Sequence, residues 1–104
     1  MYKVRFELTH PDMNFQEVLE NMKAAYAGSD YASRTEDLIK DKIILWRETS
    51  IEDGKCVFYS YWSSKEANEI WTQSIYDTPA TKLFYDNLHN MGFTFVIDKE
   101  EIED

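Results

Sequence analysis

The sequence predicts an α+β fold of the ferredoxin-like type, a βαββαβ sandwich with a four-stranded antiparallel sheet and helices on one face. The spacing of apolar residues along the 104-residue chain gives the order strand, helix, strand, strand, helix, strand. Right-handed crossover connections leave few other arrangements for that order. No repeat or Pro/Gly-rich linker interrupts the sequence, so we expect one domain over residues 1–104.

The first strand is expected over residues 2–9, where apolar and polar side chains alternate with period two. Its apolar face, which we expect to meet the helices, consists of Tyr2, Val4, Phe6 and Leu8. Its polar face consists of Lys3, Arg5, Glu7 and Thr9. A helix follows Asn14, because Asn14 and Glu17 have the spacing of a capping box. Residues 29–41 are polar and weakly periodic, so we expect a loop there with one turn of helix.

A β-hairpin is the most clearly indicated local structure. Its strands are expected at residues 42–51 and 55–63, which are rich in apolar, aromatic and β-branched side chains. Gly54 lies in the turn between them, where a positive φ is needed.

Two helices and a last strand complete the expected fold. Ser63 or Ser64 caps the first of these helices, and Pro79 occupies the first position of the second. The last strand is expected over residues 93–98. The acidic tail at about residues 99–104 is expected to fray.

Charge and composition argue against several classes of partner. Twenty acidic and eleven basic side chains give a net charge of −9, so nucleic acid and anionic membrane surfaces would be repelled. Cys56 is the single cysteine, which excludes an intramolecular disulfide and a cysteine metal cluster. The sequence starts directly on alternating structure and has no apolar run of membrane-spanning length. We therefore expect a cytoplasmic protein that binds neither nucleic acid nor membrane.

The sheet face that the helices leave uncovered is expected to form a homodimer interface. Residues 43–46 and 57–62 carry large apolar or aromatic side chains on both faces of the hairpin. An apolar sheet face of this size is a liability in a monomer. A second copy related by two-fold symmetry is the simplest cover for it.

Aromatic side chains make up 15% of the sequence, more than one small core readily hides. The candidate ligand-binding residues are Arg5, Glu7, Trp46, Tyr59, Tyr61, Trp62, Trp71 and Phe84. The aromatic members would form the walls of a cleft, and the polar face of the first strand would orient a polar group of the ligand. Two alternatives remain open. The aromatic rings can instead fill the core and the interface, and Arg5 and Glu7 can pair with neighbours such as Arg47 and Glu48.

Residues 58–71, FYSYWSSKEANEIW, resemble the third strand and second helix of the dimeric α+β barrel proteins, especially the antibiotic-biosynthesis monooxygenase-like group. The resemblance rests on Trp62, the two serines after it, Glu66, Ala67 and Trp71. It implies two sheets closed into a barrel, with a cleft between sheet and helices in each subunit. It also implies oxygenation without a cofactor as one activity of the group.

This sequence lacks two of the residues that the resemblance to the haem-degrading members of this group implies. The resemblance implies a haem-binding His about ten residues after Trp71, where this sequence has Thr81. It also implies an Asn in the first strand, where Arg5, Phe6 and Glu7 stand. We therefore expect no haem and no other cofactor.

Metal binding is not expected either, since His10 and His89 lie far apart and lack the spacing of metal ligands. Three hypotheses follow. The first is a homodimer that binds a small hydrophobic molecule, whether fatty, polyketide-like or aromatic. The second is a cofactor-independent monooxygenase, and the third is a dimerisation module without a ligand.

Overall fold

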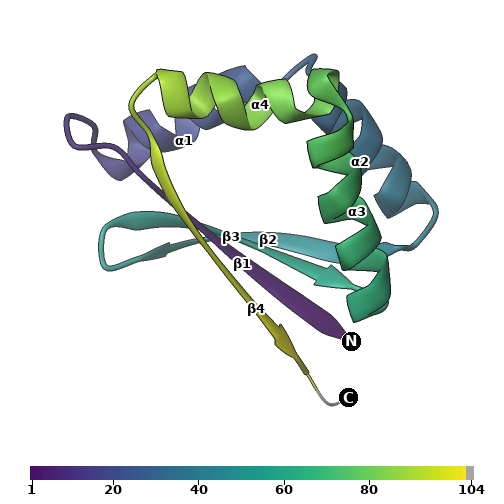
Figure 1. Cartoon of the computed structure of the whole chain (residues 1–104). Coiled ribbons are helices and arrows are strands. Elements are labelled where there is room, and N and C mark those ends of the chain that lie inside the picture. The colour runs from purple at the N-terminus through teal and green to yellow at the C-terminus, as the bar shows by residue number, and fades with distance from the viewer. Residues whose placement is uncertain (103–104) are drawn as a thin grey trace.

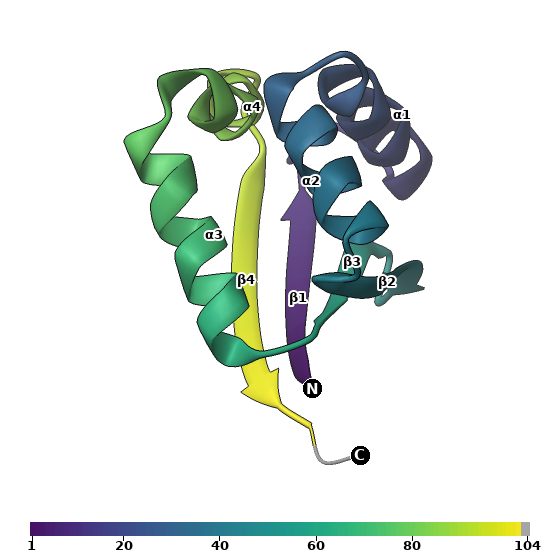
Figure 2. The ribbon, with the colours of Figure 1, turned by 90° about the vertical axis from the view of Figure 1, so that its right-hand side faces the viewer.

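The computed structural model describes residues 1–102 and confirms the predicted ferredoxin-like α+β fold. The elements in order are β1 (Tyr2–Thr9), α1 (Phe15–Tyr26), α2 (Asp30–Lys40), β2 (Ile44–Glu52), β3 (Lys55–Trp62), α3 (Lys65–Asp77), α4 (Pro79–Asn90) and β4 (Thr94–Glu101). The strands form an antiparallel sheet in the order β2-β3-β1-β4. The helices lie on one side of this sheet, and its other side, the open face, is uncovered (Figures 1 and 2).

Local signals fix the ends of several elements as predicted. The side chain of Asn14 accepts a hydrogen bond from the backbone N–H of Glu17, and that of Ser64 accepts one from Ala67. Pro79 stands at the start of α4. The β2–β3 turn has φ values of 52° at Asp53 and 75° at Gly54, the left-handed conformation that two-residue hairpin turns need.

Residues 30–40 form helix α2, and the prediction of a loop there was wrong. The helix is capped by Ser29, whose hydroxyl accepts from the N–H of Ala32 at 3.0 Å. It packs against α4 and β2, with Ala32 and Thr35 buried. The buried hydroxyl of Thr35 bonds the carbonyl of Ala32 at 3.0 Å, so it is satisfied within the helix. Tertiary packing of a short apolar stripe therefore outweighs weak sequence periodicity here.

The last strand is longer than predicted, because residues 99–101 belong to β4 rather than to a frayed tail. They pair with the start of β1, where Glu101 lies opposite Tyr2. The N–H of Ile102 then donates to the carbonyl of Met1 at 2.9 Å. The last two residues of the expected tail, 103–104, lie outside the described part. The backbone hydrogen bonds between β4 and β1 thus stabilise this segment more than repulsion among its acidic side chains destabilises it.

Two groups of buried side chains form the core between sheet and helices. One group consists of Leu8, Val18, Cys56, Phe84, Leu88 and Phe93, and the other of Tyr2, Ile44, Trp62, Trp71 and Ile75. Tyr31 and Tyr85 contact both groups. Within residues 1–102, no helix combines the length and apolarity needed to cross a membrane.

Candidate functional site

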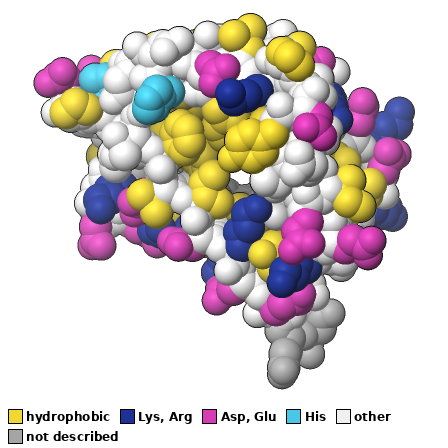
Figure 3. Space-filling view, viewed as in Figure 1, with side chains coloured by type: hydrophobic (Ala, Val, Ile, Leu, Met, Phe, Trp, Pro, Cys, Tyr) yellow, Lys and Arg dark blue, Asp and Glu magenta, His cyan; other side chains and the backbone are white. Residues whose placement is uncertain are grey.

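A cavity of about 750 Å³ lies between the helix-covered face of the sheet and the helices. The alternation of β1 directs Val4 and Phe6 into it, and β4 adds Phe95, Ile97 and Lys99. The helices contribute Leu19, Met22, Tyr26, Tyr31, Asn68, Trp71, Thr72, Ile75, Phe84 and Tyr85. Figure 3 shows a hollow bordered by hydrophobic side chains on this side of the molecule.

Stacked and tilted aromatic rings form a large part of the cavity wall. Phe6 stacks on Phe95 with ring centroids 5.4 Å apart, and Tyr31 stacks on Phe84 at 4.4 Å. The hydroxyls of Tyr31 and Tyr85 lie 3.1 Å apart and bond each other. Burial raises the pKa of both tyrosines, so both hydroxyls are neutral at physiological pH.

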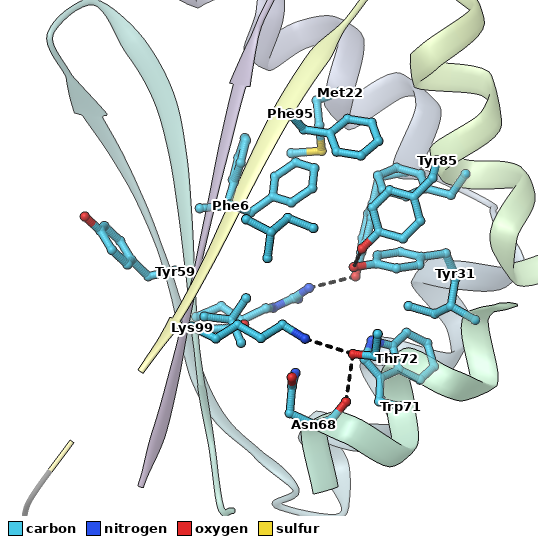
Figure 4. Close-up of a pocket in the computed structure, with 18 of the residues that line it drawn as sticks. Phe6, Met22, Tyr31, Tyr59, Asn68, Trp71, Thr72, Tyr85, Phe95 and Lys99 are labelled. Atoms are coloured by element: carbon cyan, nitrogen blue, oxygen red, sulfur yellow. Dashed lines mark hydrogen bonds between the residues drawn. The ribbon is translucent and has the colours of Figure 1, made fainter. Parts of the chain in front are cut away.

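Asn68, Thr72 and Lys99 form the polar end of the cavity (Figure 4). The ammonium of Lys99 donates to the hydroxyl of Thr72 at 3.1 Å, and that hydroxyl donates to the backbone carbonyl of Asn68 at 2.9 Å. Desolvation lowers the pKa of Lys99, against a smaller opposite effect of Glu69. Asn68 is 3% exposed, and its Oδ1 accepts no hydrogen bond within residues 1–102. An unsatisfied buried acceptor is uncommon and calls for a partner.

A second polar network lies behind Trp71 and ties three helices together. Arg34 of α2 donates to the hydroxyls of Ser74 in α3 and Thr81 in α4, the latter at 2.9 Å. Thr81 in turn donates to Asp30, and it is fully buried. The guanidinium of Arg34 also lies 5.1 Å from the centre of the Trp71 ring. The position at which the resemblance implies a haem-binding His thus holds a hydroxyl that is already engaged by the protein.

Four of the eight candidate residues from the sequence line the cavity, namely Tyr59, Trp62, Trp71 and Phe84. Both tryptophans are buried in one core group, and Phe84 belongs to the other. Trp62 faces the helix-covered side of the sheet, because it lies opposite the buried Tyr2. Trp71 and Phe84 reach the same side from α3 and α4. The rings of Trp62, Trp71 and Phe84 were expected either to fill the core or to line a pocket, and in the structure they do both.

Five of the candidates, Arg5, Glu7, Trp46, Tyr59 and Tyr61, carry their side chains on the open face of the sheet. Tyr59 borders the cavity, but its side chain points away from it (Figure 4). Their side chains do not join the cavity walls, because the alternation that turns Val4 and Phe6 inward turns Arg5 and Glu7 outward.

On the open face, Arg5 is surrounded by acceptors. Its guanidinium lies 3.3 Å from the carboxylate of Glu7 and 3.4 Å from that of Glu52, to which Tyr59 also donates. Hydrogen bonding, chiefly with Tyr59, raises the pKa of Arg5. Arg5 thus pairs with Glu7 in its own strand and with Glu52 of β2, and Glu7 also lies 3.8 Å from Lys55 of β3. Arg47 takes no part, because it reaches Glu36 on the helix-covered side at 2.8 Å.

Sequence reasoning missed the polar end and the tyrosine pair. Lys99 was expected in a frayed tail and Tyr31 in a loop. Asn68 lies three residues before Trp71 on one helix face, so this spacing could have placed it beside that ring. Its missing hydrogen-bond partner has no signature in the sequence.

His10 and Cys56 have structural roles. His10 bonds the carbonyl of Met91 through Nε2 at 2.9 Å and accepts from the N–H of Asp12 at 3.1 Å. Cys56 donates to the carbonyl of Phe15 at 3.1 Å, and burial raises the pKa of its thiol. In the described residues, no three His, Cys, Asp or Glu side chains are placed to hold one metal ion.

Comparison with known proteins places the fold. No family model and no curated protein matches the sequence. A candidate antibiotic biosynthesis monooxygenase from Deinococcus radiodurans is similar in structure, with a TM-score of 0.64 and 13% identity over 100% of this chain and 94% of that one. The two chains share a fold. An Arabidopsis thaliana protein is similar with a TM-score of 0.60 and 14% identity, over 100% of this chain and 97% of its own.

Proposed function

We propose that this protein binds a small hydrophobic molecule in the cavity between sheet and helices. The size and lining of the cavity carry this proposal. Its volume of about 750 Å³ falls in the range of roughly 300–1,000 Å³ that is usual for ligand pockets. Protein interiors are otherwise close-packed, so apolar side chains around a space of this size stay in contact with water, which costs free energy. A fatty, polyketide-like or aromatic compound that displaces water from these rings offsets that cost.

The ligand-binding residues in this proposal are Trp62, Trp71 and Phe84, together with the residues of the polar end. Each of the three rings borders the cavity and is held by packing on its other side. Such walls are preorganised, so little side-chain entropy is lost on binding. Arg5, Glu7, Trp46, Tyr59 and Tyr61 are assigned instead to an interface on the open face.

Filling the cavity by substitution tests this function. We expect Val4→Phe, which adds a ring inside the cavity, to weaken binding of the neutral fluorophore N-phenylnaphthylamine by more than about tenfold. A loss of that size corresponds to about 1.4 kcal/mol. The measurement is a titration of fluorescence enhancement with the wild-type and variant proteins.

The matched control is Val96→Phe, which makes the same change on the open face of β4, where Val96 lies opposite Glu7. It is expected to leave the affinity for the fluorophore unchanged. Equal losses from both variants, or no binding by the wild type, would contradict the proposal.

The proposed assembly is a homodimer in which two open faces meet. Trp46 and Val96 are exposed on this face, and Trp46 stacks on Tyr61 with centroids 4.2 Å apart. Arg5, Glu7 and Glu52 each already have an ion-pair partner within the subunit, so their burial against a second copy leaves none of the three without an oppositely charged neighbour. An exposed aromatic pair beside satisfied charges is suited to an isologous contact.

Light scattering after size exclusion tests the dimer. We expect a dimer for the wild type at micromolar concentration and a shift to monomer for Trp46→Asp, because a carboxylate would be buried without a partner. Ile70→Asp is the control, since Ile70 is exposed on α3 away from the open face. A monomeric wild type would refute the proposed dimer.

A cofactor-independent monooxygenase is the second candidate. The structural likeness to the Deinococcus protein supports it, as does an aromatic cavity that could exclude water from a reduced aromatic substrate. Such a substrate would itself supply the electrons, with one oxygen atom entering the product and the other leaving as water. Oxygen uptake with a panel of dihydroquinones and anthrones tests it, and an absence of uptake across the panel counts against it. A module without a ligand would bind no fluorophore at all.

A further inference from the structure

The cavity differs in chemistry along its length. Phe6, Met22 and Phe95 lie together at one end, and Asn68, Thr72 and Lys99 lie at the other (Figure 4). An apolar ligand without a polar group would leave the second end unused. The arrangement fits an elongated amphipathic molecule with one polar group.

Lys99 supplies a positive charge that has no carboxylate within 4 Å among residues 1–102. It lies opposite Val4 in the β1–β4 pairing, so it shares the helix-covered face of the sheet. Its ammonium bonds the hydroxyl of Thr72, and within residues 1–102 none of the ion pairs includes it. Four other lysines do have carboxylate partners within 4 Å, namely Lys3, Lys55, Lys65 and Lys82. An ammonium has three donors, so Lys99 keeps two for a ligand.

Asn68 supplies a second group without a partner, from a different element. Its side chain is 3% exposed and borders the cavity, and its Oδ1 accepts no hydrogen bond in the described part of the chain. The same amide carries an NH₂ group, which is a hydrogen-bond donor. Facing an anion, the NH₂ group would donate.

We propose that the polar end binds the carboxylate of an apolar monocarboxylic acid, with Lys99 as its ion-pair partner and Asn68 as a hydrogen-bond donor. This inference rests on the proposed function, because the apolar part of the acid occupies the aromatic cavity. One ammonium and one amide suit a singly charged planar head. A phosphate dianion would call for more donors than this end offers.

The net charge of −9 does not oppose this binding at close range. Exposed charges beyond about 10 Å are largely screened at ordinary ionic strength. Glu69 is the neighbouring carboxylate that acts on Lys99, and it pairs with Lys65 at 3.9 Å. The head group therefore meets the local positive charge of Lys99, whose side chain also reaches solvent.

Displacement of N-phenylnaphthylamine by matched ligands tests the inference at neutral pH, where carboxylates are ionised. Decanoate and decanol form the chain pair, and naphthoate and naphthalenemethanol form the ring pair. We expect the wild type to bind at least one of the two acids about tenfold more tightly than its alcohol. The pair with the larger ratio tells whether the natural acid is aliphatic or aromatic.

Three variants locate the effect. Lys99→Met is expected to weaken acid binding about tenfold and so remove the preference for the acid over the alcohol, and Lys99→Arg is expected to retain most of the preference. Lys3→Met makes the same charge change on the open face and is expected to have no effect. Equal affinity for acid and alcohol in the wild type, or a preference that survives in Lys99→Met, would overturn the inference while fluorophore binding persists. If the wild type binds no fluorophore, the proposed function itself is overturned.

Discussion

Phe84→Ala is expected to lower the free energy of unfolding by about 3–5 kcal/mol, the range for truncating a buried aromatic side chain. Phe84 is 5% exposed and packs in the core group that includes Leu8 and Leu88. Its ring stacks on Tyr31 at 4.4 Å, which joins α4 to α2. Its removal leaves a void that merges with the existing cavity. Urea denaturation followed by circular dichroism measures the change.

Leu83→Ala is the control for this prediction, since Leu83 is the preceding residue of α4 and is 53% exposed. An exposed substitution of this kind is expected to change stability by about 0.5 kcal/mol or less. Unfolding of both variants at the same urea concentration would contradict a stabilising contact between Phe84 of α4 and Tyr31 of α2.

Asn68→Leu is expected to raise the free energy of unfolding of the unliganded protein by about 1–2 kcal/mol. The substitution removes a buried acceptor that has no hydrogen-bond partner within residues 1–102. Burying such an unsatisfied group lowers the free energy of unfolding by about 1–3 kcal/mol. Leucine has a similar volume and adds apolar area next to Trp71. The same variant is expected to bind decanoate more weakly, because it loses a donor for the head group. A gain in stability with a loss of binding is typical of a functional polar group.

Asn87→Leu makes the same change at an exposed position of α4 and corrects for the difference in helix propensity. Its stability is expected to stay within about 0.5 kcal/mol of the wild type. A destabilised Asn68→Leu protein would show that the Asn68 amide has a partner in solution, and would remove one support for the polar end.

The fold was predictable because its signals are local and repeated. Strict alternation fixed β1, Gly54 fixed the hairpin turn, and Asn14 and Pro79 marked the starts of α1 and α4. Helix α2 was not predictable in the same way, since its few apolar residues gain their stability from packing on α4 and β2. The extension of β4 depends on pairing with β1, which is distant in sequence.

The site was predictable only where side chains were aromatic. Trp62, Trp71 and Phe84 could be proposed as walls from residue type alone. The side of the sheet that each strand residue faces was also available from the alternation, and it separates Arg5 from Val4. The contact between Lys99 and Thr72 joins two elements across the cavity, so it depends on tertiary structure.

Two-dimensional NMR of isotope-labelled methionine methyl groups tests ligand binding in the cavity most directly. The chain has four methionines, of which Met22 lines the cavity and Met1, Met13 and Met91 do not. Titration with N-phenylnaphthylamine is expected to shift the Met22 signal strongly through ring currents, with little change at Met1 and Met91. A Met22 signal that stays fixed while the fluorophore binds, or shifts of equal size at every methionine, would contradict binding in this cavity.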